Sequence, residues 1–351
     1  MFLTLFAAAA LAVVTPTPPA AVPGHALLGP DFAAGTAHSQ AAKAIIARAR
    51  AALSRPPGAI PRLHTEGTLP GKGIREISLV AKRDQPIVLD LAIAWRLTGD
   101  RAFLEQAGRY LDAWARVYQM SFNPIDETGF DTLVMAGDLT EADLPADVRA
   151  RLDAFWRAMA TGYLDAMDVP PRNANTNTNW QSHRIKLATM AAFQTGDHRL
   201  IDRARTAYRA QIGANLHADG STYDFEERDA LHYVTYNLEP LLMAALAARA
   251  HGEDWYGWSA PDGASLPRSL AWLAEFARGT HTHIEFAHSK VQFDRDRAGA
   301  GQGEYAPHVW TPGSALLTFQ LASRLDPGFA ELARSLAAAN PRERSNWIAL
   351  F

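Results

Sequence analysis

The sequence predicts an all-α fold, an incomplete (α/α) toroid of paired antiparallel helices, and three observations lead to this prediction. Apolar residues recur at helical spacing along most of the 351-residue chain. Strand-like alternation is scarce, and residues 280–293 alone suggest an extended loop or a short strand. Two helical segments end in the same Thr-Gly-Asp sequence, at residues 98–100 and 195–197, and another helix follows each at once. Short junctions of this kind join helices that pack side by side, and the chain is too long for one four-helix bundle.

Ten segments carry the helical pattern, and we expect ten to twelve helices in all. The pattern is clearest in residues 101–117, where apolar residues at i, i+3/i+4 and i+7 end at Trp114. Pro145 opens another segment, in which Phe155, Trp156 and Met159 share one face. The expected helices cover residues 39–53, 87–97, 101–117, 145–159, 184–194, 198–216, 233–251, 266–278, 314–325 and 329–340.

The N-terminal segment is typical of an exported protein. Residues 2–14 form an apolar run that is too short to span a bilayer, and small residues and prolines follow it, although no Lys or Arg precedes it. We expect a signal peptide at residues 1–22, an extended leader at 23–37 and a single toroid domain at 38–351. The expected location is therefore periplasmic or secreted, with no membrane contact after processing.

Composition excludes several classes of site. The chain has no cysteine, which excludes disulfides and thiolate metal sites. Its formal net charge of −3 gives no global attraction to polyanions, so we do not expect nucleic acid as a partner. An anionic substrate would need a local basic pocket. The sequence does not indicate an oligomeric state.

Polar side chains gather at residues 175–184 (Asn-Thr-Asn-Thr-Asn-Trp-Gln-Ser-His-Arg), before an expected helix. An Asn-rich run does not stay helical easily, so it predicts a loop that leads into a helix near Trp180. Alternate residues of a loop can point into one cleft. We therefore expect Asn179, Gln181 and His183 to be functional, and the earlier asparagines to be caps and turns.

A second polar stretch spans residues 224–237. The helix dipole favours acidic groups at a helix start and disfavours a cation there, so Arg228 is expected to point at an anion. Tyr233 and Tyr236 are three residues apart and share a helix face, with His232 beside it. Phenol and imidazole groups can transfer protons. Core packing with a satisfied hydroxyl stays open for at least one of the tyrosines.

Two further segments carry candidate binding groups. Residues 281–297 include His283, Glu285 and His288, but their spacing matches no zinc signature, so no metal is expected. Substrate contact by Lys290 and the arginines of this segment, or a purely structural role, is preferred. The Gly-rich segment 67–76 lacks the Walker pattern. It is either a carboxylate-binding rim with Lys72 and Arg75 or an ordinary surface loop.

Taken in order, five motifs resemble the alginate lyase family of α/α-toroid polysaccharide lyases, including the related glucuronan (cellouronate) lyase branch. The resemblance covers most of residues 65–320 and rests on residues 73–78, 97–100, 177–180, 232–238 and 283–294. In that family an Asn-Asn-His segment supplies the amide and imidazole of the active site, and a later Arg and Tyr complete it. Here Asn177-Thr178-Asn179 stands at that place, and the nearest histidine is His183, four residues further on.

The resemblance implies β-elimination on a 4-linked polyuronate, an acidic polysaccharide, without a cofactor. Asn179, Gln181 and Arg228 would neutralise the substrate carboxylate. Tyr233, favoured over Tyr236 by its spacing from Asn179, would transfer protons alone or with His183. The expected substrate-binding residues are Gln181, Trp180, Lys72, Arg75, His232, Glu227, His288 and Lys290.

Two other functions remain open at the level of sequence. A glycoside hydrolase on a similar scaffold would need two carboxylates across a cleft, for which Glu226, Glu227 and Asp294 are available. A non-catalytic polysaccharide-binding protein would use aromatic platforms, and the candidates are Trp180, Trp255, Trp258 and Trp310.

Overall fold

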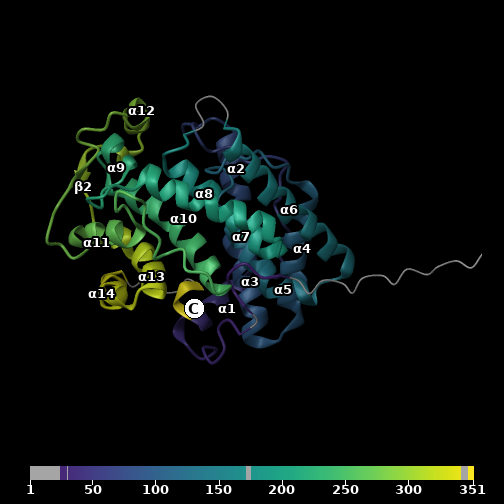
Figure 1. Ribbon diagram of the computed structural model, residues 1–351. Coiled ribbons are helices and arrows are strands. Elements are labelled where there is room, and N and C mark those ends of the chain that lie inside the picture. Colours follow the sequence, from purple (N-terminus) through teal and green to yellow (C-terminus); the bar gives the residue numbers. More distant parts are fainter. Residues whose placement is uncertain (1–23, 30, 171–174, 341–346) are drawn as a thin grey trace, which may run out of the picture.

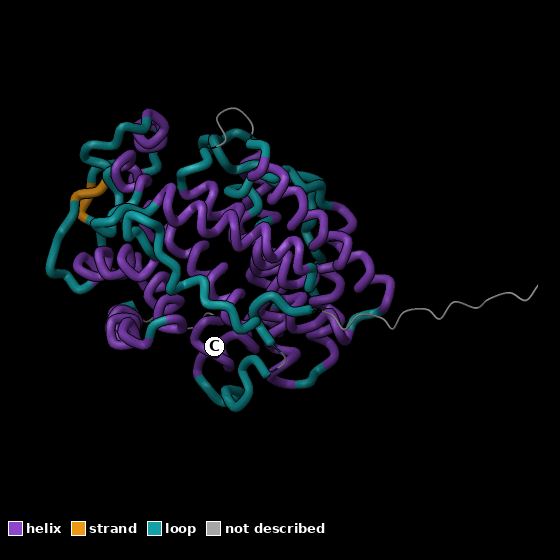
Figure 2. The backbone as a smooth tube through the Cα atoms, viewed as in Figure 1, coloured by secondary structure: helices purple, strands orange, loops and turns teal. Residues whose placement is uncertain are grey.

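The computed structural model of the protein describes residues 24–29, 31–170, 175–340 and 347–351. This part of the chain contains fourteen α-helices (Figure 1) and a single two-stranded antiparallel sheet, formed by β1 (Ile284–Glu285) and β2 (His308–Val309) (Figure 2). The predicted all-α class is confirmed, and β1 is a short strand within residues 280–293. The expected signal peptide lies outside the described residues.

The helices pack in three successive groups, and the second and third share α10. In the first group, α3 (Asp84–Thr98) packs against α1 (Gln40–Ala51), α4 (Arg101–Val117) and α5 (Asp131–Thr140). In the second, α7 (Asn179–Thr195) packs against α6 (Ala146–Asp168), α8 (His198–Asn215) and α10 (Leu231–Ala250). In the third, α10 packs against α11 (Leu266–Ala277) and α13 (Leu316–Leu325), and α14 (Ala330–Ala339) packs against α13.

Four helices lie outside the ten expected segments. They are α5 and the short helices α2 (Ile74–Ala81), α9 (Tyr223–Arg228) and α12 (Gln292–Gly299). The three short ones have eight residues or fewer, too few for a helical period to stand out in the sequence. In Figure 1, α9 and α12 lie together at one end of the molecule, beside β2.

Both Thr-Gly-Asp junctions end one helix and start the next, as predicted. Gly99 and Gly196 are the C-caps of α3 and α7 and have φ angles of 70° and 65°, which glycine adopts without steric cost. Asp100 and Asp197 are the N-caps of α4 and α8, and each side chain accepts an N–H of the new helix. The junctions thereby satisfy helix-end groups within two residues.

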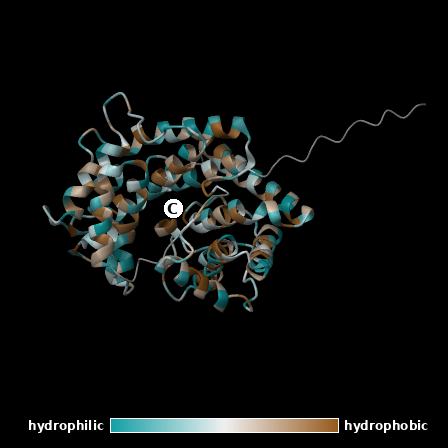
Figure 3. Cartoon of the chain, turned by 90° about the horizontal axis from the view of Figure 1, so that it is seen from below, coloured by the Kyte–Doolittle hydropathy of each residue, from teal (hydrophilic) through white to brown (hydrophobic). Residues whose placement is uncertain are grey.

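Helices α7 and α10 form the centre of the fold. Of the 17 residues of α7, 14 are buried, and 15 of the 20 residues of α10 are buried. Most other helices carry both hydrophobic and hydrophilic residues (Figure 3), as expected where one face is packed and the other meets solvent. A polar side chain at the contact of α7 and α10 is therefore held in place by packing on several sides.

The chain between residues 24 and 28 is tied into the core. Both Ala26 and Leu28 are fully buried. The carboxylate of Asp138 on α5 accepts three successive N–H groups, those of residues 26, 27 and 28, at 2.6, 2.9 and 2.8 Å. Part of the expected leader is thus a packed element of the domain. None of the helices within the described ranges is both long enough and apolar enough to cross a membrane.

Candidate active site

The contact of α7 with α10 brings His183 and Tyr236 together. Their ring centroids are 4.3 Å apart. His183 is only 3% exposed, whereas Tyr236 is half-buried. Within the described chain, no group forms a hydrogen bond with the Tyr236 hydroxyl. A phenol that is open to a ligand therefore lies against a buried imidazole, although 53 positions separate the two residues in the sequence.

A polar cluster of Thr128, Lys186 and Asp131 lies beside Nδ1 of the His183 imidazole. His183 Nδ1 is 2.7 Å from Thr128 Oγ1. Lys186, one turn further along α7, donates to the main-chain oxygen of Thr128 at 2.8 Å, to Thr128 Oγ1 at 3.0 Å and to Asp131 Oδ2 at 2.6 Å. Burial, and then the positive charge of Lys186, lower the pKa of His183 well below its ordinary value. The imidazole is therefore neutral at neutral pH.

Tyr233 lies deeper than Tyr236 and is already bonded to the protein. It is 5% exposed and packs against Ala230 and Phe286. Its hydroxyl accepts a hydrogen bond from Arg297 Nη1 at 3.1 Å. The guanidinium of Arg228 lies 4.0 Å from its ring centroid, in a cation–π contact. Of the two tyrosines, Tyr236 therefore has the hydroxyl that is free to meet a substrate.

The expected position of Arg228 at a helix start is wrong. Arg228 ends the separate helix α9, and the chain then turns at Asp229, whose φ is 51°. A cation is favoured at a helix C-terminus, so the local charge pattern has an ordinary explanation. Arg228 does face an anion, but this anion is the protein's own Asp294: Nη1 to Oδ1 is 2.5 Å, and the Asp294 side chain is 1% exposed.

Arg297 is a cation of a different kind. Its guanidinium lies 4.5 Å from the ring centroids of both Phe293 and Tyr305, and it donates to Tyr233. It forms no ion pair with any carboxylate in the part of the chain that the structure describes. Burial raises the pKa of Tyr236, and the charge of Arg297 opposes this effect, so Arg297 acts electrostatically on the open phenol. Sequence analysis named Arg297 only among the arginines of residues 281–297 that could contact the substrate.

The residues at the start of α7 do not meet in one cleft. The helix already begins at Asn179, so residues two apart point to different sides. Asn179 is 3% exposed, and its Nδ2 donates to Asp224 Oδ1 at 2.6 Å. Gln181 lines a cavity of about 390 Å³ that residues of α6 and α8 also line, and its Oε1 accepts from Arg184. The ring of Trp180 is half-buried, with the guanidinium of Arg184 at 5.8 Å.

Charged residues of segment 281–297 form pairs with α9 and with Asp229, the residue that follows α9. Lys290 Nζ is 3.1 Å from Glu227 Oε1. Both His283 and His288 contact the carboxylate of Asp229, at 3.2 and 3.0 Å. Glu285 instead accepts the main-chain N–H of His232. Across the described ranges, no group of three or more His, Asp or Glu side chains is placed to hold a metal ion.

A groove lies between residues 64–74 and α12. Its volume is about 840 Å³, and its lining includes Lys72, Phe293 and Arg295. Arg297 is on the same short helix α12, although it is not among the residues that line the groove. His232 is exposed, and its ring is nearly parallel to that of Tyr236, with centroids 6.2 Å apart. Arg75 is half-buried on α2.

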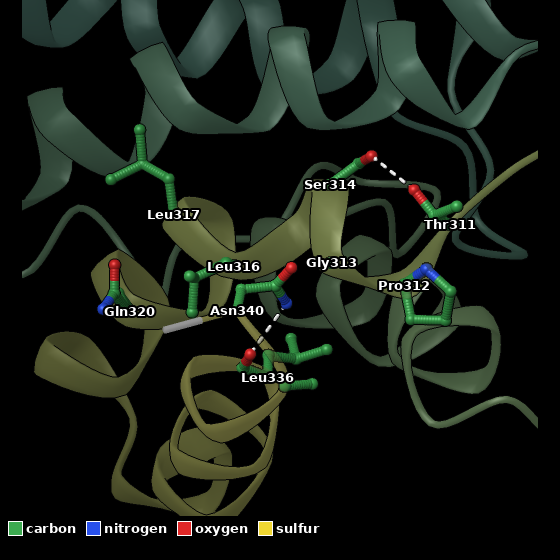
Figure 4. Close-up of a pocket in the computed structure, with 10 residues that line it drawn as sticks. Thr311, Pro312, Gly313, Ser314, Leu316, Leu317, Gln320, Leu336 and Asn340 are labelled. Carbon is green, nitrogen blue, oxygen red and sulfur yellow. Dashed lines mark hydrogen bonds between the residues drawn. The ribbon is translucent and has the colours of Figure 1, made fainter. Parts of the chain in front are cut away.

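Another cavity, of about 740 Å³, lies between α13 and α14 (Figure 4). Its described lining contains no charged side chain and is made of neutral residues such as Leu317, Gln320 and Leu336. Hydrogen bonds such as that from Asn340 Nδ2 to the Leu336 oxygen, at 2.8 Å, are local.

The fold places the chain in a known structural class, the toroid of alginate lyases. An alginate lyase from Bacteroides ovatus superposes with a TM-score of 0.63 at 16% identity, covering 87% of this chain and 91% of that one. Alginate lyase A1-III from Sphingomonas species A1 superposes with a TM-score of 0.53 at 20% identity, covering 73% and 80%. The predicted incomplete (α/α) toroid is confirmed.

Sequence comparison identifies the family. The profile described as Alginate lyase matches residues 31–283, and the chain belongs to this family. A protein of Stenotrophomonas maltophilia (strain K279a), described as a polysaccharide lyase, is 36% identical over 110 residues. That match spans 31% of this chain and 32% of the relative, about a third of the relative's length.

Proposed function

We propose that the protein is a polysaccharide lyase that cleaves a β-1,4-linked polyuronate, glucuronan (cellouronate) or the polymannuronate of alginate, by β-elimination. Membership of the alginate lyase family supports this proposal. So does the likeness in fold to a variant of alginate lyase A1-III complexed with a tetrasaccharide, at a TM-score of 0.56 and 18% identity. The observation that carries the proposal is the open phenol of Tyr236, which lies against the neutral imidazole of His183.

The substrate carboxylate needs a cation or a hydrogen-bond donor. The C5 proton of a uronate becomes removable only when the charge that develops on the neighbouring carboxylate is stabilised. Arg228 is paired with Asp294, and the amide of Asn179 is bonded to Asp224, so neither group is free for this role. Arg297 is free of carboxylate partners within the described residues, and we assign the carboxylate to it.

The phenol of Tyr236 can move both protons. As a phenolate it takes the proton from C5, and the electrons of the C5–H bond form the C4–C5 double bond while the C4–O4 bond breaks. The phenol then returns the proton to O4, and the phenolate is regenerated. One group suffices when C5–H and O4 lie on the same face of the sugar. Tyr233, whose hydroxyl is bonded to Arg297, helps to hold that guanidinium in place.

The groove beside α12 gives the polymer a path. Lys72 and Arg295 line it and can meet the carboxylates of neighbouring uronate units, which compensates for the net negative charge of the chain. His232 lies beside Tyr236. The exposed Lys290 and His288 pair with the half-buried Glu227 and Asp229 at the end of α9. A periplasmic or secreted location fits a polymeric substrate and remains a prediction from residues 1–22.

The three carboxylates considered for a hydrolase are each paired with a basic residue of the protein. Asp294 is buried against Arg228, Glu227 pairs with Lys290, and Glu226 lies 3.5 Å from His217. A glycoside hydrolase would need two carboxylates facing each other across the cleft. This arrangement favours elimination.

Product analysis on a panel of polymannuronate, polyguluronate, glucuronan and hyaluronan tests the proposal. Elimination creates an unsaturated uronate that absorbs in the ultraviolet, and hydrolysis does not. We expect absorbance to rise on polymannuronate or glucuronan. New reducing ends without absorbance would establish a hydrolase, and binding without either signal would establish a binding protein.

A further inference from the structure

The hydrogen bonds around Thr128 can be counted donor by donor. A lysine ammonium has three N–H donors and no acceptor. Lys186 is 6% exposed, and its three donors have three acceptors: the main-chain oxygen of Thr128, Thr128 Oγ1 and Asp131 Oδ2. Thr128 Oγ1 therefore accepts one hydrogen bond from Lys186 and still has its own hydrogen to donate.

The hydrogen of the Thr128 hydroxyl has one available acceptor. In the described structure, the remaining hydrogen-bond partner of Thr128 Oγ1 is His183 Nδ1, at 2.7 Å. Since the imidazole is neutral, one of its nitrogens accepts and the other carries the hydrogen. If Nδ1 accepts from Thr128, the hydrogen lies on Nε2. In the opposite tautomer Thr128 Oγ1 would accept twice, and its own hydrogen would have no acceptor among these groups.

Helix α10 supplies an independent observation. A main-chain carbonyl in an α-helix normally accepts the N–H of the residue four positions later. For Tyr236 that residue is Pro240, which lies inside α10 and has no N–H. The Tyr236 carbonyl acts on the imidazole of His183 by favouring a proton on the ring. His183 Nε2 is buried and no donor in the described chain points at it, so a hydrogen on Nε2 meets no competing donor, and the Tyr236 carbonyl favours it.

We propose that Thr128, oriented by Lys186, is a positioning residue that fixes His183 in the tautomer with hydrogen on Nε2. This inference rests on the proposed function, because it assigns His183 a task within that site. With Nδ1 accepting from Thr128 and the buried Nε2 protonated, His183 has no lone pair free to take a proton. The C5 proton therefore goes to Tyr236.

Nitrogen-15 NMR of the histidine rings tests the tautomer without substrate. The chain has 12 histidines, and a His183→Gln spectrum identifies the signal that disappears. We expect the His183 ring to show a protonated Nε2 and an unprotonated Nδ1 at neutral pH. A protonated Nδ1 would overturn the inference. Because this readout needs no turnover, an inactive protein with the expected pattern would refute the proposed function and leave the tautomer standing.

A pair of variants tests the role of Thr128. Thr128→Val keeps the shape and removes the hydroxyl, whereas Thr128→Ser keeps the hydroxyl. We expect Thr128→Val to lower kcat by about tenfold with little change in KM, the range seen when an orienting partner of a catalytic group is lost, and to mix the two tautomers. Thr128→Ser should restore both readouts. A folded Thr128→Val protein with unchanged kcat and tautomer would overturn the proposal, and the wild-type spectrum decides the tautomer if that variant does not fold.

Discussion

Replacing Arg297 by glutamine should impair catalysis much more than stability, because the partners of this guanidinium are aromatic rings and a neutral hydroxyl. Arg297→Gln removes two ring contacts at 4.5 Å and one hydrogen bond of 3.1 Å to a phenol. Each is a modest interaction, and the loss of all three should lower the free energy of unfolding by about 2 kcal/mol. No buried carboxylate among the described residues loses its partner. The folded protein should therefore survive the change.

The effect on turnover should be larger. Loss of one preorganised donor to a developing negative charge costs about 10²- to 10³-fold in kcat, or about 3–4 kcal/mol of transition-state stabilisation. Arg228→Gln should show the reverse balance, because it leaves the buried Asp294 carboxylate unpaired, at a cost of about 3–5 kcal/mol of stability. Arg334→Gln, at an exposed arginine of α14, is the matched control for loss of one positive charge.

The assay is initial rate of ultraviolet absorbance on the preferred polyuronate, with thermal melts of all three variants in parallel. We expect Arg297→Gln to be folded and nearly inactive, and Arg334→Gln to match the wild type in both measurements. An Arg297→Gln protein with rates within a few-fold of the wild type would refute the assignment of the carboxylate to Arg297.

Three further predictions follow from the same contacts. Burial raises the pKa of Tyr236, so the phenolate is scarce at neutral pH and kcat/KM should rise about tenfold per pH unit between about pH 6 and pH 9; a rate that falls over this range would contradict a phenolate base. Lys72→Ala should raise KM a few-fold at low salt, leave kcat unchanged and lose its effect at high salt, unlike Lys43→Ala on α1. Asp138→Ala should lower the free energy of unfolding by about 3 kcal/mol or more, measured by denaturant titration, because three N–H groups lose their acceptor; a change below 1 kcal/mol would show that residues 26–28 are not anchored there.

Sequence periodicity was enough for the fold because its signals are local. A helical stripe, a C-cap glycine such as Gly99 and an N-cap such as Asp100 are each decided within a few residues. The same locality explains the error at Arg228. One cluster of charges suits the start of α10 or the end of a separate helix, and the sequence alone does not show that α9 ends at residue 228.

The site was predictable only in part because its contacts join distant segments. His183 and Tyr236 were both candidates, but their pairing depends on how α7 lies against α10. Arg297 contacts Tyr233 and Tyr305, which lie in different segments of the chain, so the sequence does not show that its partners are aromatic. Thr128 stands in no motif, and only the contact of η1 (Thr128–Phe130) with α7 places its hydroxyl beside the imidazole.

The most direct test of the central claim compares Tyr236→Phe with Tyr233→Phe in the ultraviolet lyase assay. Both variants remove one hydroxyl and keep the ring. We expect Tyr236→Phe to lose about 10³-fold or more in kcat with an unchanged thermal melt, because proton transfer is abolished. Tyr233→Phe should stay within about tenfold of the wild type, since it loses one hydrogen bond to Arg297. An active Tyr236→Phe protein beside an inactive, folded Tyr233→Phe protein would contradict the assignment and make Tyr233 the proton-transfer residue.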